Sequence, residues 1–140
     1  MNEYGFSDCQ VGMEESFETV ITDKMLAQFC EMTDDTNPLH LDRAFAIEHG
    51  FSDRVAYGLL TLSFISKLAG VFLPGKYCVI QQIESKFSAP VYVGDKLNVR
   101  GVVHELHESV QQMEIRYEIR NQHGKRVVHG KLKVGFTRCD

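Results

Sequence analysis

The sequence lacks several features that mark common functional classes. Its basic residues are scattered along the chain and its formal net charge is −4 at pH 7, which argues against nucleic-acid binding. No low-complexity tract or linker divides the 140 residues, so they are predicted to form a single domain, 1–140. A hydrophobic content of 44% is enough for one core, although a domain this small often gains stability from a partner chain.

The cysteines form no recognisable motif. Cys9, Cys30, Cys78 and Cys139 lie far apart and contain no CxxC pair, which argues against a zinc site and a thioredoxin-type motif. The histidines are not spaced as metal ligands either. Residues 1–5 have neither the basic start nor the apolar stretch of a signal peptide. We therefore expect free thiols, no metal and a cytoplasmic protein.

No apolar run is long enough to predict a membrane span. The most apolar segment, from Tyr57 to Leu73, is interrupted by Lys67, and its uncharged part is too short to cross a bilayer. Its apolar residues surround nearly the whole circumference of a helix. This pattern predicts a helix that is buried on most sides.

Strand-like patterns dominate the rest of the chain. Residues 14–21 alternate before the helix, and residues 77–87, 97–103, 113–119 and 128–136 alternate after it. Two shorter helices are expected, one capped by Thr22 and one capped by Asp42 and ended by Gly50. Long antiparallel strands after a buried helix predict an α+β fold, in which a curved sheet wraps around that helix. An edge of such a sheet stays open unless it is paired.

The loop from Thr33 to His40 is the main candidate for a catalytic segment. It places Asp35 and His40 five residues apart around an Asn37-Pro38 bend. Pro38 prevents both side chains from stacking along one helix face. The loop can turn them to one point, which suits two groups that share a water and transfer protons. The alternative is an Asx-type turn followed by a surface histidine.

The run from Asp35 to Asp42, followed by Ala44-Phe45-Ala46, resembles the signature of the MaoC-like, or R-specific, enoyl-CoA hydratases. The signature has the pattern Asp-x-Asn-Pro-hydrophobic-His, followed by a short helix with small residues. The resemblance continues through residues 54–60, 73–76 and 87–95. It implies a hot-dog fold, no cofactor, and a homodimer in which two sheets join.

The resemblance also implies an activity and a set of site residues. Its members interconvert trans-2-enoyl and (R)-3-hydroxyacyl thioesters, carried on coenzyme A or on acyl carrier protein. By this resemblance Asp35 and His40 share the water and the proton, and the Gly58 amide at the start of the central helix stabilises the oxyanion. Ser66 matches a serine that assists the pair in some members, and Asn37 holds the shape of the loop. As an alternative, Gly58 is a packing glycine.

Two positions depart from the family pattern. Many relatives have His-Gly where this chain has Tyr57-Gly58. A tyrosine still donates a hydrogen bond to substrate, but it is larger and remains neutral near pH 7. Asp34, next to Asp35, replaces a residue that is often glycine, and we expect its side chain to face water.

Two other functions remain open from the sequence. A hot-dog thioesterase generally carries its acid on the central helix, but no Asp or Glu occurs between Gly58 and Phe72. A non-catalytic acyl-thioester-binding module would not need both Asp35 and His40. The sequence shows no cluster of basic residues as a docking surface, so coenzyme A and acyl carrier protein are both possible carriers.

Overall fold

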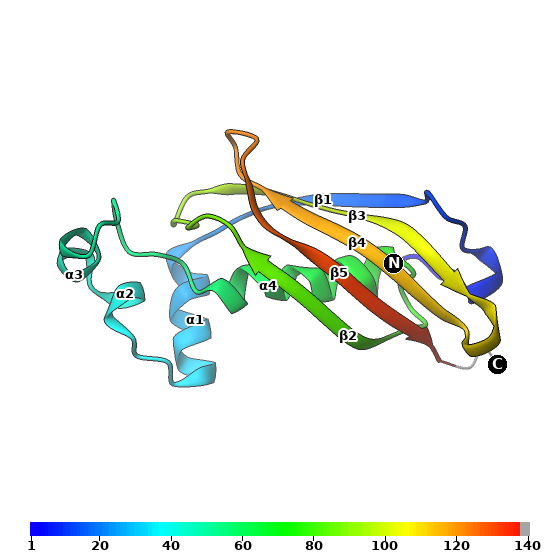
Figure 1. The fold of residues 1–140 in the computed structure, drawn as a ribbon. Helices are drawn as coiled ribbons and strands as arrows, with labels where there is room; N and C mark the ends of the chain where they lie inside the picture. The colour runs from blue at the N-terminus through cyan, green and yellow to red at the C-terminus, as the bar shows by residue number, and fades with distance from the viewer. Residues whose placement is uncertain (138–140) are drawn as a thin grey trace.

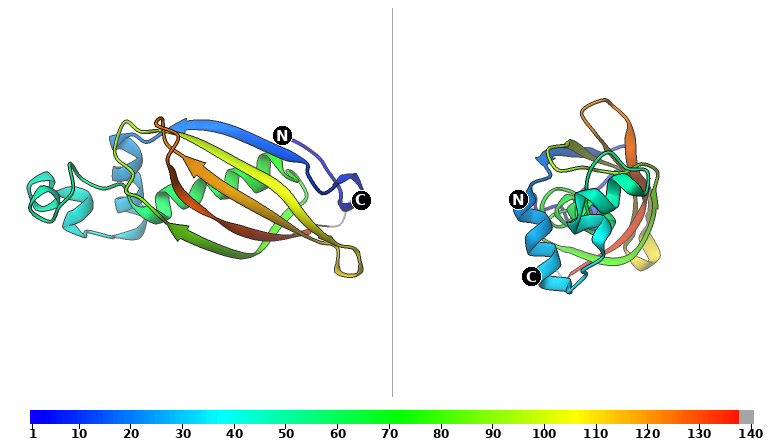
Figure 2. Two further views of the ribbon diagram at one scale, coloured as in Figure 1. Left: turned by 45° about the horizontal axis from the view of Figure 1, so that its top comes forward. Right: turned by 90° about the vertical axis from the view of Figure 1, so that its left-hand side faces the viewer.

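An antiparallel sheet of five strands wraps around one helix (Figures 1 and 2). The structure, a computed structural model, describes residues 1–137. The strands lie in the order β1-β3-β4-β5-β2, so β1 and β2 form the two edges. Their bounds are β1 Glu14–Val20, β2 Cys78–Phe87, β3 Lys96–His107, β4 Gln112–Arg120 and β5 Arg126–Phe136. The α+β hot-dog architecture predicted for the chain is confirmed.

The central helix is α4, Gly58–Lys67, which continues into a π-helical turn at Leu68–Phe72. Figure 2 shows the strands curving around it when the molecule is viewed along the helix. Gly101 of β3 lets the helix approach, because a Cβ there would lie 2.7 Å from Leu68 Cδ2. Leu68 is fully buried at this contact. Among the described residues, no helix is both long and apolar enough to cross a membrane.

Strand β4 confirms the alternation expected from the sequence. Met113, Ile115, Tyr117 and Ile119 are buried against the helix side of the sheet, whereas Arg116 is exposed on the other face. Burial of alternate residues fixes the register, because a slip of one residue would turn the apolar set to solvent. The core therefore lies between the sheet and α4, and charged side chains cover the outer face.

The edge strand β2 differs from its prediction. The sequence pattern predicted that Val79, Ile83 and Phe87 would lie on one buried side. They are 43%, 41% and 51% exposed in the single chain. A register shift between Ile80 and Gln82 is one reason: Val79 pairs with Gly135 and Ile83 with Leu132, so the two side chains lie on opposite faces of the sheet. The other reason is that β2 is at the edge of the sheet. Leu59 of α4 is also 63% exposed, so the expected burial of the helix on most sides holds only in part.

Three short helices lie beyond the N-terminal end of α4 (Figure 1). They are α1 Asp23–Thr33, α2 Pro38–Leu41 and α3 Arg43–Glu48. Thr22 caps α1 by accepting a hydrogen bond from the Met25 N–H at 3.2 Å, and Asp42 caps α3 in the same way. Both predicted caps are confirmed. Single 3₁₀ turns at Phe6–Asp8 and Glu108–Val110 complete the described elements.

Candidate active site

Hydrogen bonds within the loop fix the segment between α1 and α2. Asp34 ends α1 with a left-handed backbone conformation, at φ 57°, and Asp34 is exposed to solvent as expected. The Asn37 N–H donates to Asp35 Oδ1 at 3.1 Å, which forms the Asx-type turn that the sequence left open as an alternative. Asn37 Oδ1 accepts from the Leu39 N–H at 3.0 Å and caps α2. The loop is therefore ordered by its own side chains.

The His40 ring is held in one orientation. Its Nδ1 lies 2.6 Å from the carbonyl oxygen of Val55. A carbonyl only accepts, so Nδ1 carries the hydrogen, and Nε2 keeps a free lone pair in the neutral ring. The ring also stacks on Tyr57, with 4.0 Å between centroids. This arrangement leaves Nε2 available to accept a proton.

Tyr57 links the loop to the start of α4. It is only 2% exposed, and its ring lies against both His40 and Phe29. Its hydroxyl donates to the backbone oxygen of Asp35 at 2.7 Å. Burial raises the pKa of Tyr57 to about 12, with smaller contributions from Cys30 and Asp35, so the ring stays neutral. A contact of Tyr57 with substrate remains a prediction, whereas its contact with the Asp35 loop is observed.

Gly58 begins α4 close to Phe87 of β2. The first helical bond after it is donated by the Thr61 N–H to the Tyr57 oxygen at 3.1 Å, so the Gly58 N–H precedes the helical ladder. The helix dipole favours negative charge at this end. A Cβ at Gly58 would lie 3.2 Å from Phe87 Cδ1 and Cε1. Glycine therefore keeps the amide open to a neighbouring group and also serves the packing role considered from the sequence.

Two adjoining cavities meet at these residues. One has a volume of about 340 Å³ and the other about 210 Å³, and both are lined by His40, Gly58 and Phe87. Asp35 and Tyr57 line the smaller cavity. The larger one is also lined by Phe51, Val55, Ala56, Thr61, Ser88, Ala89, Pro90, Val91 and Val128. The structure thus brings Asp35, His40, Tyr57 and Gly58 together around a largely apolar space.

Ser66 is not part of this group. It lines neither cavity and is exposed about two turns further along α4, so its assisting role stays a prediction without structural support. Thr61, which the sequence reasoning missed, lies at the cavity wall instead. It is 1% exposed, and its Oγ1 has no hydrogen-bond partner among the described residues. Its position three residues after Gly58, on the same helix face, was the available signal.

Possible metal ligands gather elsewhere. On the outer face of the sheet, ligand atoms of His104, Glu105 and Glu114 lie within 4.8 Å of one another. The Lys131 ammonium is 3.8 Å from Glu114 and supplies positive charge there. These residues line neither cavity, so the candidate active site consists of Asp35, His40 and the start of α4.

Comparisons with known proteins identify the family of the chain. The model of the MaoC-like domain family matches residues 9–127. The chain is 39% identical over 101 residues to a 3-hydroxybutyryl-CoA dehydratase of Methylorubrum extorquens, a match that covers 72% of this chain and 64% of that protein. It is 35% identical over 109 residues to an (R)-specific enoyl-CoA hydratase of Aeromonas caviae, covering 78% and 81% of the two chains.

The solved structure of the (R)-hydratase from A. caviae superimposes with a TM-score of 0.88 at 31% identity, and the match covers 92% of this chain and 98% of that one. The fold and the sequence therefore identify the same family. The chain belongs to the MaoC-like family, and it is an enzyme of the hydratase and dehydratase class that acts on acyl thioesters.

Proposed function

We propose that the chain interconverts trans-2-enoyl and (R)-3-hydroxyacyl thioesters by adding or removing water. Hydration delivers the oxygen of water to C3 and a proton to C2, while negative charge develops on the thioester oxygen. The observation that carries this proposal is the placement of His40, Asp35 and the Gly58 amide around adjoining cavities. Each of the three tasks then has a candidate group within one site.

His40 and Asp35 handle the water in this proposal. The neutral His40 ring accepts a proton at Nε2 as the water oxygen bonds to C3, and it then returns that proton to C2. Asp35 Oδ1 already accepts from the Asn37 N–H, so Oδ2 is the oxygen that holds the second hydrogen of the water. The bond between Tyr57 and the Asp35 backbone keeps this carboxylate near His40.

The Gly58 N–H stabilises the thioester oxygen. It stands at the start of α4, before the first helical bond, where a free amide and the helix dipole favour negative charge. A donor that is oriented in advance costs no reorganisation during the reaction. The buried, unpartnered hydroxyl of Thr61 is a second donor or acceptor for the same cavity. The apolar remainder of the lining takes the acyl chain.

A second copy of the chain completes the apolar edge of the fold in this proposal. Val79, Ile80, Ile83 and Phe87 of β2 and Leu59 of α4 are all at least 41% exposed, and β2 is an edge strand. Pairing of two β2 edges covers this surface and removes an open edge. Sedimentation of the wild type at the mass of two chains, and of Ile83→Lys at one, is expected. A monomeric wild type contradicts the homodimer.

Hydration of crotonyl-CoA, followed by the loss of enoyl absorbance, tests the proposed activity. Asp35→Asn keeps the shape of the side chain but replaces the charged carboxylate that holds the water beside His40 with a neutral amide, so we expect kcat to fall at least ~100-fold. Asp34→Asn is the matched control, because it makes the same change at an exposed neighbour that lines neither cavity. It should retain wild-type activity.

The products separate the remaining functions. Formation of the R-3-hydroxy product supports the hydratase. Release of free thiol without hydration, tested with short, medium and branched enoyl thioesters, would instead identify a thioesterase. Saturable binding of the thioester with no turnover would identify a binding module.

A further inference from the structure

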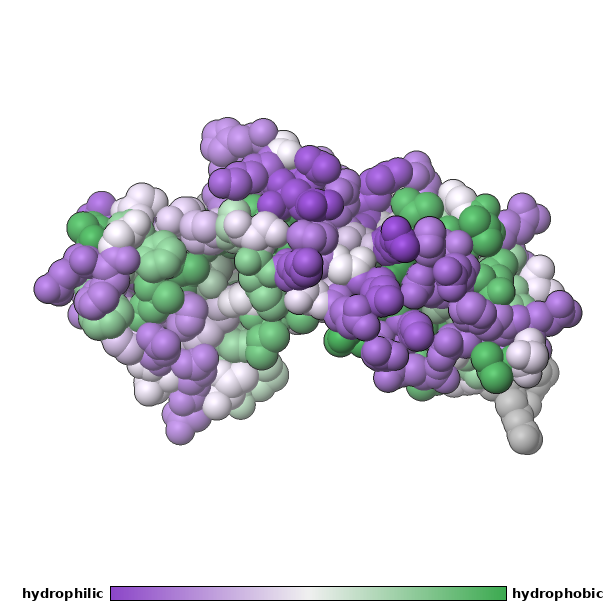
Figure 3. Space-filling model, in the orientation of Figure 1, coloured by the Kyte–Doolittle hydropathy of each residue, from purple (hydrophilic) through white to green (hydrophobic). Residues whose placement is uncertain are grey.

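The outer face of the sheet carries a basic depression that the linear sequence does not reveal. Its volume is about 630 Å³. Five of its charged lining residues are basic and two are acidic, a local net charge of +3 on a chain whose net charge is −4. The basic residues are Lys86, Arg100, Arg116, Arg126 and Lys131, and with His129 we call them the basic patch. Figure 3 shows this face as largely hydrophilic.

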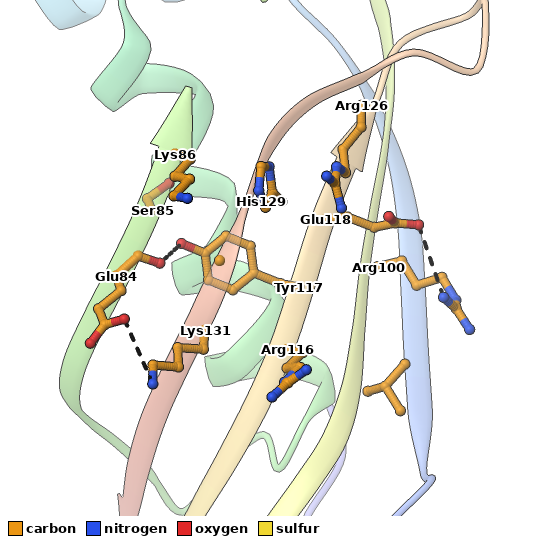
Figure 4. Close-up of a pocket in the computed structure, with 12 residues that line it drawn as sticks. Glu84, Ser85, Lys86, Arg100, Arg116, Tyr117, Glu118, Arg126, His129 and Lys131 are labelled. Carbon is orange, nitrogen blue, oxygen red and sulfur yellow. Dashed lines mark hydrogen bonds and ion pairs between the residues drawn. The ribbon is translucent and has the colours of Figure 1, made fainter. Parts of the chain in front are cut away.

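Sheet pairing assembles the basic patch from four strands. Lys86 of β2 pairs with His129 of β5, which pairs with Glu118 of β4, which pairs with Arg100 of β3. The next row joins Glu84, Lys131, Arg116 and Val102 in the same strand order. With strands about 4.8 Å apart, each row is about 14 Å long. Figure 4 shows these side chains along the neighbouring strands.

Much of the positive charge in the basic patch is not neutralised. Arg100 pairs with Glu14 and Glu118, and Lys131 pairs with Glu84 and Glu114. Lys86, Arg116 and Arg126 form no ion pair with any residue that the structure describes. Burial lowers the pKa of His129, and the charges of Arg126 and Lys86 lower it further. The carboxylate of Glu118 acts on His129 in the opposite direction, but basic residues outnumber acidic ones around the depression.

The basic patch shares a wall with the candidate active site. Lys86 lines the patch, and the next residue, Phe87, lines both catalytic cavities. Val128 lines the larger cavity and His129 lines the patch. His129 Nδ1 also lies 3.3 Å from the Oγ of Ser88, another wall residue of that cavity. The two sites therefore adjoin on opposite faces of the sheet where β2 ends at Phe87.

We propose that the basic patch binds the phosphates at the nucleotide end of coenzyme A, while the acyl group occupies the cavity at His40 and Gly58. This proposal rests on the proposed function and names the carrier of its substrate. Coenzyme A bears a diphosphate and a 3′-phosphate, and both Arg and Lys bind phosphate through charge-assisted hydrogen bonds. The volume of the depression lies within the range of small-molecule sites.

Paired substrates test the proposal. Crotonyl-CoA and crotonyl-pantetheine present the same acyl group and arm, but only the first has the nucleotide. For Arg126→Glu and Lys86→Glu we expect the KM for crotonyl-CoA to rise ~10- to 100-fold, with kcat unchanged and crotonyl-pantetheine unaffected. High salt should reduce the difference in the KM for crotonyl-CoA between the wild type and these variants, because it screens the charges. The conservative variant Lys86→Arg should have the wild-type KM for crotonyl-CoA, since arginine keeps the positive charge.

Lys96→Glu is the control for a general change of charge, because Lys96 is exposed on β3 and does not line the patch. It should match the wild type on both substrates. Thermal unfolding of each variant shows whether it is folded. If Arg126→Glu and Lys86→Glu lose activity equally on crotonyl-CoA and on crotonyl-pantetheine, the proposal is overturned, since the patch then has only a structural role. If these variants lose activity only on crotonyl-acyl carrier protein, the proposal is also overturned, and the patch is then a surface for docking that protein.

Binding of adenosine 3′,5′-bisphosphate, measured by calorimetry, separates this proposal from the proposed function. This binding measurement requires no turnover, so it tests the coenzyme A proposal even if the chain hydrates no thioester. We expect saturable binding that weakens at least ~10-fold in Arg126→Glu. Failure of the wild type to bind this nucleotide would overturn the proposal, whereas absence of hydration alone would overturn only the proposed activity.

Discussion

Replacing Tyr57 with phenylalanine removes one hydroxyl from the contact between α4 and the Asp35 loop. The hydroxyl donates to the Asp35 backbone oxygen at 2.7 Å. The ring contacts with His40 and Phe29 do not depend on it. Phenylalanine fills the same space, so no cavity forms and the change isolates a single hydrogen bond.

The expected effects on stability and activity are different in size. A neutral hydrogen bond of this kind contributes about 1 kcal/mol to the free energy of unfolding, and the exposed Asp35 segment can bind water in its place. The melting temperature should therefore fall by only about 3 °C. The loop loses its anchor beside His40, however, and a displacement of about 1 Å of a catalytic group can cost ~100-fold in rate. We expect kcat to fall between ~10- and 100-fold.

Tyr117→Phe is the matched control for this prediction. The Tyr117 hydroxyl also donates to a backbone oxygen, that of Glu84, at 2.6 Å. Tyr117 lines the outer-face depression and neither catalytic cavity, so the comparison uses kcat at saturation and not KM. Both variants should lose similar stability, measured by thermal unfolding, and only Tyr57→Phe should lose kcat on crotonyl-CoA at saturation. If Tyr57→Phe keeps the wild-type kcat, the hydroxyl does not position Asp35 and the argument fails.

Two further predictions concern stability. Asp34→Gly should raise the free energy of unfolding by about 0.5–1 kcal/mol in urea denaturation, because Asp34 adopts a left-handed backbone at φ 57° that glycine reaches without strain; a decrease would contradict this reason. Burial raises the pKa of Cys9 and of Cys78 to about 11 and that of Tyr57 to about 12. The unfolded chain loses these protons at lower pH than the folded chain, so stability should fall from about pH 9 to pH 12. Urea titrations across this range test it, and a flat profile would refute it.

The alternation of β4 and the apolar segment that became α4 could be predicted because each is a local pattern with a local cause. Side chains alternate across a strand, and a helix that is apolar on most sides requires cover. The Asx-type turn at Asp35 and the cap at Asn37 are equally local, since their donors and acceptors lie two residues apart. For these features the order of residues along the chain was sufficient.

Other features depend on groups that meet only after folding. The sequence cannot show that the Tyr57 hydroxyl is bonded to Asp35, or that Thr61 lines the cavity while Ser66 does not. The exposure of Val79 and Ile83 follows from the register shift within β2 and from its place at the edge of the sheet, and neither is visible in the pattern of the strand itself.

The basic residues show this difference most clearly. Lys86 and Arg126 are 40 positions apart in the sequence, where they look scattered. Pairing of β2 with β5 places them on the same side of the sheet, next to His129 and behind the cavity wall. The sequence by itself determined the family, the helix and strand segments and the Asp35–His40 loop, because these follow from neighbouring residues. The tertiary structure decided which distant charges and hydroxyls share a surface, since strand order and register set those distances.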